Sequence, residues 1–155
     1  MRKIVKAAIA AVFACGVALV PGGVASAETA DADAICIMQV DAPAWGAGVL
    51  HLRKCNAFRH IAWNADGSRE EIFAVRVDGT VWHTWPGNNG WSLMPGNKTA
   101  DDMINPPFDG PDPEGRDSVW WSGSTRNLSV WAPGGTGYWC TSDPGAGWTG
   151  VWRDC

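Results

Sequence analysis

The sequence is poor in Lys and Arg, and in His, the residue that most often carries acid–base chemistry. It has 12 Lys and Arg against 16 Asp and Glu, and only 3 His. Nucleic acids and anionic membranes attract basic surfaces, so this balance argues against both as partners. The sequence contains no Cys-x-x-Cys pair, His-x-x-x-His pair, nucleophile elbow or phosphate-binding loop. We therefore expect no metal and no cofactor, and catalysis has no motif to support it.

Long apolar runs are also scarce, and the longest one lies at the N-terminus. Three basic residues stand within the first six positions, an Ala/Val-rich run covers 7–20, and Ala25-Ser26-Ala27 follows. This order predicts a secretory signal peptide over 1–27 and a secreted, extracellular protein. The alternative, a membrane anchor, is disfavoured because the run is short and Pro21-Gly22-Gly23 ends it. Removal of 27 residues leaves 128 residues with a net charge of −7. This length predicts one domain over 28–155, and we expect no stable membrane insertion.

Four cysteines follow the predicted signal peptide: Cys36, Cys55, Cys140 and Cys155. An even number in an exported chain predicts two disulfides, for which three pairings exist. We expect the local pairs Cys36–Cys55 and Cys140–Cys155, because a Gly-rich turn signal lies midway between the members of each pair. Each bond would then join the two strands of one hairpin.

No segment has a helical period with caps, and short β-rich runs alternate with Gly, Pro, Asn and Asp. The sequence therefore predicts an all-β, disulfide-stapled domain of antiparallel sheets with blade-like or sandwich-like packing. We expect nine strands, near 35–40, 49–54, 58–64, 69–77, 80–85, 118–123, 128–132, 137–142 and 148–152.

Two Asp-Gly pairs, Asp66-Gly67 and Asp78-Gly79, predict a central meander with two-residue turns. In that register Phe73 faces Thr84, Val75 faces Trp82, Ile72 faces Trp85, Ile61 faces Ile72, His60 faces Phe73 and Phe58 faces Val75. Both faces of the meander would be apolar, so we expect the sheet to be covered on both sides.

A shift of 47 residues places Ile72 on Val119, Val81 on Leu128 and Trp91 on Tyr138, which suggests a weak internal repeat of the size of one propeller blade. Between the two copies, residues 94–117 carry five Pro and six acidic residues and predict a long surface loop. Its carboxylates, Asp109, Asp112, Glu114 and Asp117, leave open a calcium site, although a solvated loop is the favoured interpretation.

Residues 69–96 contain Asp78-Gly79, then Trp82-His83 and Trp85, then Gly90-Trp91-Ser92. In this order they resemble one repeat of the tryptophan-rich β-propeller lectins, and residues 116–149 resemble a second, degenerate repeat. The resemblance covers about a third of the chain and implies monosaccharide binding between blades without catalysis. The disulfides depart from the family pattern and favour a compact domain over a ring of blades.

Eleven Trp against one Tyr exceed what a core of this size needs, so we expect some indoles to be exposed and to bind a ligand. The predicted ligand-binding residues lie beside turns: Trp85, Asn88, Asn89, Trp91 and Trp148. Glu70, Glu71 and His83 are candidates for acid–base chemistry, but in the predicted register they do not converge. The sequence thus predicts a secreted, non-catalytic carbohydrate-binding module. A protein–protein adaptor is the second hypothesis and a secreted hydrolase the third; the partner is a glycan or a protein, and a homo-oligomer is possible.

Overall fold

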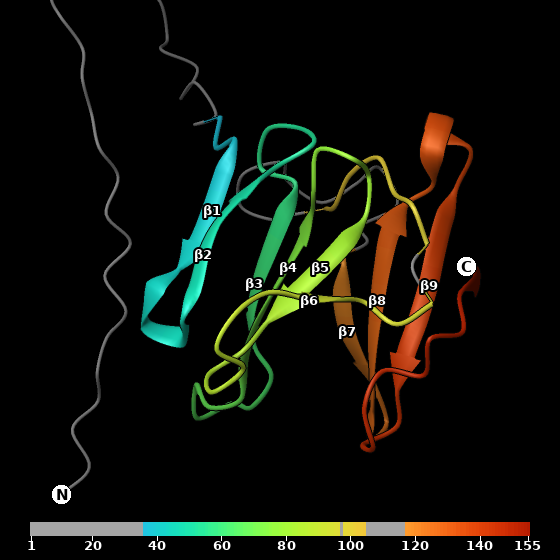
Figure 1. Cartoon of the computed structure of the whole chain (residues 1–155). Coiled ribbons are helices and arrows are strands. Elements are labelled where there is room, and N and C mark those ends of the chain that lie inside the picture. The colour runs from blue at the N-terminus through green and yellow to red at the C-terminus, as the bar shows by residue number, and fades with distance from the viewer. Residues whose placement is uncertain (1–35, 97, 105–116) are drawn as a thin grey trace, which may run out of the picture. The chain divides into compact units, whose positions relative to one another are not determined.

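A computed structural model describes residues 36–96, 98–104 and 117–155, all of which belong to the unit 34–155 (Figure 1). It is all-β, as predicted, and its two larger sheets are antiparallel meanders in chain order. The first has the order β3-β4-β5-β6, with strands β3 (Phe58–Ala62), β4 (Glu70–Val75), β5 (Val81–Thr84) and β6 (Ser92–Leu93). The second has the order β7-β8-β9-β10, with strands β7 (Val119–Ser122), β8 (Thr125–Trp131), β9 (Tyr138–Asp143) and β10 (Arg153–Asp154).

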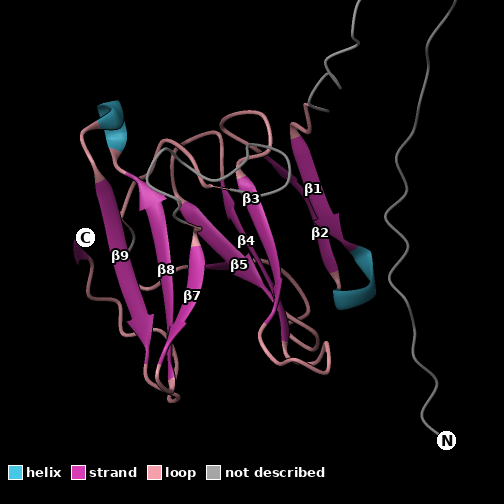
Figure 2. Cartoon of the chain, turned by 180° about the vertical axis from the view of Figure 1, so that it is seen from behind, coloured by secondary structure: helices cyan, strands magenta, loops and turns pink. Residues whose placement is uncertain are grey.

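A separate hairpin precedes the two meanders. Its strands are β1 (Gln39–Ala42) and β2 (Ala47–His51), and the 3₁₀ turn η1 (Pro43–Trp45) joins them. A second 3₁₀ turn, η2 (Pro133–Gly135), joins β8 to β9. Figure 2 shows the hairpin beside the first meander when the molecule is seen from behind. The prediction of a strand over 148–152 is wrong, because that segment is irregular and the short strand begins at Arg153.

The predicted register of the central meander is wrong by one residue. Phe73 pairs with His83 and Arg59, whereas Thr84 and His60 both pair with Ile72. Both loops are three residues long: Arg76 N–H donates to Thr80 C=O across 77–79, and Asn64 N–H donates to Ser68 C=O across 65–67. Each loop ends on a glycine with positive φ, 76° at Gly67 and 84° at Gly79, as in the common three-residue hairpin loop. The extra residue shifts every cross-strand partner to the opposite face.

Both faces of the first meander are covered, as the apolar pattern predicted. One face packs against the second meander, and the buried residues between them include Phe73, Val75, Val81, Leu128 and Val130. On the other face, Ile72 packs with Ala42, Trp45 and Ala47 of the hairpin. The packing is therefore that of a sandwich, with the hairpin as an additional cover.

The two local disulfides are confirmed. Cys36 bonds Cys55 at the base of the first hairpin, and Cys140 of β9 bonds Cys155 at the end of β10. Part of the predicted 94–117 loop pairs with its surroundings, since Thr99 forms a bridge with Thr80 and Asp102 forms one with Trp131. Three of the candidate calcium ligands, Asp109, Asp112 and Glu114, lie outside the described residues.

The 47-residue shift aligns β4, β5 and β6 with β7, β8 and β9. The strand pairing differs, however. Ile72 pairs with Thr84, which would place Val119 opposite Trp131, whereas Val119 pairs with Leu128. The two meanders therefore do not share one register.

Candidate functional site

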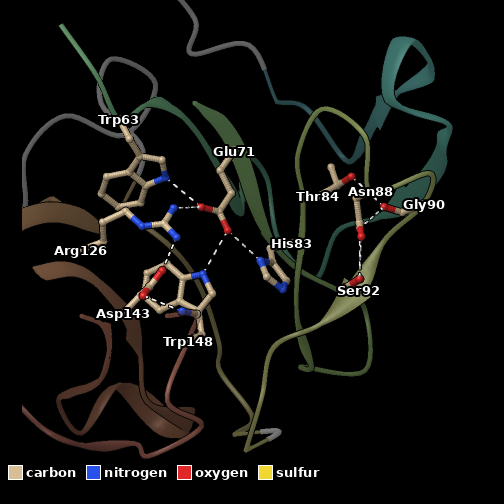
Figure 3. Close-up of polar contacts among 11 residues, drawn as sticks. Trp63, Glu71, His83, Thr84, Asn88, Gly90, Ser92, Arg126, Asp143 and Trp148 are labelled. Atoms are coloured by element: carbon tan, nitrogen blue, oxygen red, sulfur yellow. Dashed lines mark hydrogen bonds and ion pairs between the residues drawn. The ribbon is translucent and has the colours of Figure 1, made fainter. Parts of the chain in front are cut away.

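Six buried or half-buried side chains form one polar network between the two meanders: Trp63, Glu71, His83, Arg126, Asp143 and Trp148 (Figure 3). Trp63 follows the end of β3, and Trp148 lies in the loop after β9. The other four side chains belong to the start of β4, the end of β5, the start of β8 and the end of β9. Because neighbouring strands are antiparallel, these strand ends lie at the same end of the sheets, which is the lower end in Figure 1. The network thus joins the two sheets at one end of the sandwich.

The carboxylate of Glu71 is the centre of this network. Its Oε1 accepts from Trp148 Nε1 at 3.1 Å and lies 2.7 Å from His83 Nδ1. Its Oε2 accepts from Trp63 Nε1 at 2.8 Å and from Arg126 Nη1 at 2.7 Å. A carboxylate with four donors around it is fully satisfied, which is what a buried charge requires.

Arg126 connects Glu71 to a second buried carboxylate, because its Nη2 donates to Asp143 Oδ2. Asp143 Oδ1 accepts from the backbone N–H groups of Gly145 at 2.6 Å and Gly147 at 2.9 Å. Burial alone would raise the pKa of Asp143, but these two amide bonds and the guanidinium outweigh it and hold the pKa below its ordinary value. The loop that leads to Trp148 is therefore anchored on an ionised carboxylate.

Aromatic rings surround the charged groups. The Arg126 guanidinium lies 5.0 Å from the Trp63 ring centroid and 5.4 Å from that of Trp148, within the range of cation–π attraction. Phe73 is stacked on His83 at 5.9 Å and meets Trp148 edge-on at 5.4 Å. Both indole N–H groups point at Glu71 in Figure 3. The rings exclude water from the ion pairs and hold their geometry.

Strand alternation explains why these residues meet. Glu71 and Phe73 are two positions apart on β4, so both face the second sheet, and His83 lies directly opposite Phe73 on β5. On β8, Arg126 shares the inward face with Leu128 and Val130. At each strand end one inward position is polar where an apolar residue would continue the core.

The prediction that Glu71 and His83 do not converge is wrong, and the cause is the register. With two-residue turns His83 would lie opposite Ala74 and on the other face from Glu71. The three-residue loop places it opposite Phe73 instead, in contact with the Glu71 carboxylate. Glu70 lies apart from the pair, 3.6 Å from His60 Nε2.

The network is better suited to holding structure than to chemistry. Glu71 and both ends of the Arg126 guanidinium face other protein groups, and His83 is almost fully buried. Among the residues that the structure describes, no nucleophilic hydroxyl or thiol bonds to His83, and no three His, Cys, Asp or Glu side chains gather as metal ligands. Acid–base catalysis needs a group that a substrate can reach.

Two exposed tryptophans flank the network where the sandwich opens. Trp85 is 37% exposed, follows β5 directly, and its ring lies 4.9 Å from the ring of His83. Trp121 is 42% exposed, belongs to β7, and its ring lies 5.5 Å from that of Trp63. Trp121 alternates with core residue Val119 and therefore faces the first sheet. Each sheet thus carries a partly exposed tryptophan at the same end of the molecule.

The other predicted ligand-binding residues lie differently. Trp148 belongs to the network and is half-buried. Trp91 packs beside the Ile72 cluster on the outer face, and its Nε1 donates to Gly48 C=O at 2.6 Å. Asn88 is occupied within its own loop, where its amide donates to Gly90 C=O and Ser92 Oγ, while Asn89 is exposed. The structure brings Trp85 and Trp148 together around His83 and Glu71, but not Trp91.

Sequence reasoning missed Trp121, Arg126 and Asp143. Trp121 stands in the pair Trp120-Trp121, whose members point to opposite faces of an edge strand and are both exposed. Arg126 precedes the predicted strand over 128–132, but it is the second residue of β8.

Comparison of the chain with protein-family models, with curated proteins and with solved structures finds no match.

Proposed function

We propose that the chain is a secreted, non-catalytic carbohydrate-binding module whose ligand lies across the end of the sandwich between Trp85 and Trp121. The observation that carries this proposal is the exposure of two indoles beside a buried polar network. An indole face covers the apolar C–H face of a sugar ring, and its rigidity lowers the entropy that binding costs.

The disulfides and the charge balance also support the proposal. The two disulfides fit an oxidising, extracellular setting, in agreement with the predicted leader over 1–27. Within the described part of the chain, no helix is long and apolar enough to cross a membrane. The acidic charge balance argues against nucleic acid, the other common ligand of exposed aromatic rings.

A glycan array probed with the purified chain tests this function directly. We expect selective binding that is lost in the Trp85→Ala variant and kept in the Trp91→Ala variant, because the Trp91 ring packs on the outer face and its N–H donates to Gly48 C=O. Melting temperatures of both variants separate lost binding from lost folding. An array without hits, together with a protein partner recovered by pull-down, would replace the proposal with the adaptor hypothesis.

Secretion is tested by expression of the full chain in a host with an export pathway. We expect the protein in the medium, with a mature N-terminus at Glu28. Retention of an uncleaved chain in the cells would contradict this part of the proposal.

A further inference from the structure

The two exposed tryptophans contact different neighbours of one buried carboxylate, that of Glu71. Trp85 rests against His83, which contacts Glu71 Oε1, and Trp121 rests against Trp63, which contacts Glu71 Oε2. Trp63 follows β3 and His83 lies on β5, the two neighbours of β4, so the two contacts are about two strand spacings, roughly 9.5 Å, apart. A single sugar ring has about the area of one indole and can cover only one of the two.

The buried charged side chains at this end of the sandwich carry one negative charge in excess, since two carboxylates share one guanidinium. Glu71, Arg126 and Asp143 are paired with one another and buried. Asp66 and Arg69, which are exposed in the adjacent β3–β4 loop, have opposite signs. The exposed Arg69 is offset by Asp66 of the same loop, so a sialylated or sulfated sugar would meet an excess of negative charge, whereas a neutral sugar needs no counter-charge.

Trp148 contacts Glu71 of β4, the strand between β3 and β5, and its position is fixed from both sheets. Its Nε1 donates to Glu71 of the first sheet, and the loop that carries it is held by Asp143 of the second. A ligand that passes from Trp85 to Trp121 would cross the half-buried edge of this ring. Trp148 also packs on Phe73 and Trp63, so its ring is held in place before a ligand binds, as a pre-organised site requires.

Resting on the proposed function, we infer that the ligand is a neutral oligosaccharide of several units that spans both sheets, with one unit stacked on Trp85 and another on Trp121. The resemblance to propeller lectins implies a monosaccharide instead, so chain length distinguishes the two. Binding to a longer ligand gains a second stacking contact, by analogy with bases on aromatic side chains.

The test measures affinity by calorimetry for neutral glucose, xylose, mannose and N-acetylglucosamine oligomers of one to six units. We expect affinity to rise by roughly 5–150-fold between the length that covers one indole and the length that reaches the second. The Trp121→Ala variant should lose this rise and keep the affinity for short oligomers.

Trp120→Ala is the matched control. Trp120 is the neighbouring residue, is 39% exposed against 42% for Trp121, and points to the opposite face of β7. We expect it to leave the length dependence unchanged. If Trp121→Ala does not fold, 5-fluorotryptophan NMR of the unaltered chain gives the same answer, since the Trp121 resonance should shift with long oligomers and not with single sugars.

The outcomes separate this inference from the proposed function. Affinity that is independent of chain length, equal effects of the two β7 variants, or tighter binding of sialylated or sulfated glycans overturns the spanning neutral ligand and leaves a carbohydrate-binding module. The absence of binding to any glycan, on the array and in the series, overturns the proposed function as well.

Discussion

The two faces of strand β4 are both buried, but different kinds of interaction stabilise them. On the inner face, Glu71 and Phe73 meet a second sheet through a directional network of hydrogen bonds and ion pairs. On the outer face, Ile72 meets Ala42, Trp45 and Ala47 of the hairpin through apolar contact. Neighbouring residues of one strand therefore belong to two different kinds of core.

This difference has consequences for how each face tolerates change. An apolar contact is non-directional, and a side chain of similar volume replaces it at small cost. A buried ion pair fixes distances and angles, and removal of one partner leaves the other desolvated and unpaired. The inner face thereby determines how the two sheets sit at the end that carries Trp85 and Trp121, while the outer face supplies burial.

The largest expected effect comes from the same substitution at two neighbouring positions. Glu71→Leu should lower the free energy of unfolding by about 3–5 kcal/mol, because Arg126 loses a buried partner and two indole N–H groups lose their acceptor. Ile72→Leu should cost less than about 1.5 kcal/mol, because it conserves volume. Urea denaturation of both variants measures the difference, and equal costs would contradict the distinction between the faces.

Removal of the Cys36–Cys55 disulfide, which ties down the outer hairpin, should have the next largest effect. The bond closes a segment with a sequence separation of 19, which corresponds to about 3 kcal/mol in the chain-entropy model. We expect the Cys36→Ser/Cys55→Ser variant to melt earlier while its affinity for glycan is unchanged, since the hairpin covers the opposite face from Trp85. The matched variant lacks Cys140–Cys155, whose separation is 15. Loss of ligand affinity in the first variant alone would place the site on the outer face.

Much of the fold was predictable from the sequence, because local signals determine it. Turn glycines divided the chain into strands, and the even spacing of the cysteines around turn signals gave the correct pairing. The register was not predictable from Asp-Gly alone. That pair suits a two-residue loop, but here each Asp side chain accepts from the residue two positions later, Ser68 or Thr80, and the loop is one residue longer.

The candidate site was less predictable, because its members meet only through tertiary structure. Trp85 and Trp148 were identified from their turns, but the sequence distance between Glu71 and Arg126 gives no indication of their contact. The one-residue error in register also separated His83 from Glu71. An error of one residue in the loop length therefore prevented the prediction of the contact between His83 and Glu71.

A matched pair of Trp→Phe substitutions should show the contrast at smaller scale. Trp148→Phe removes a bond to the Glu71 carboxylate and should cost about 1.5–3 kcal/mol, because hydrogen bonds to charged groups are the stronger class. Trp91→Phe removes a bond to Gly48 C=O on the outer face and should cost about 0.5–1.5 kcal/mol. Denaturation curves of the two variants provide the comparison, and a larger cost at Trp91 would reverse it.

The smallest expected effect is a difference between the two faces in their response to pH. His60 lies on the outer face, directly opposite Ile72, and its ring meets Trp45 at 5.9 Å. Burial lowers its pKa, partly offset by Glu70 and reinforced by Arg59, so the folded chain takes up the proton at lower pH than the unfolded chain.

The sign of each contribution follows from the direction of its pKa shift. The stabilisation tied to neutral His60 is complete above about pH 6.5 and declines as the pH falls toward the lowered pKa of the folded state. Asp143 on the inner face has a lowered pKa, so its contribution to the free energy of unfolding is complete above about pH 4 and is lost only below that. The pKa values of Asp66, Asp78 and Asp101 are also lowered, and their contributions are lost in the same range. Melting temperatures measured between pH 7 and pH 3 should therefore show two separate declines. His60→Gln should remove the first and leave the second, whereas persistence of the first decline in this variant would assign it to another group.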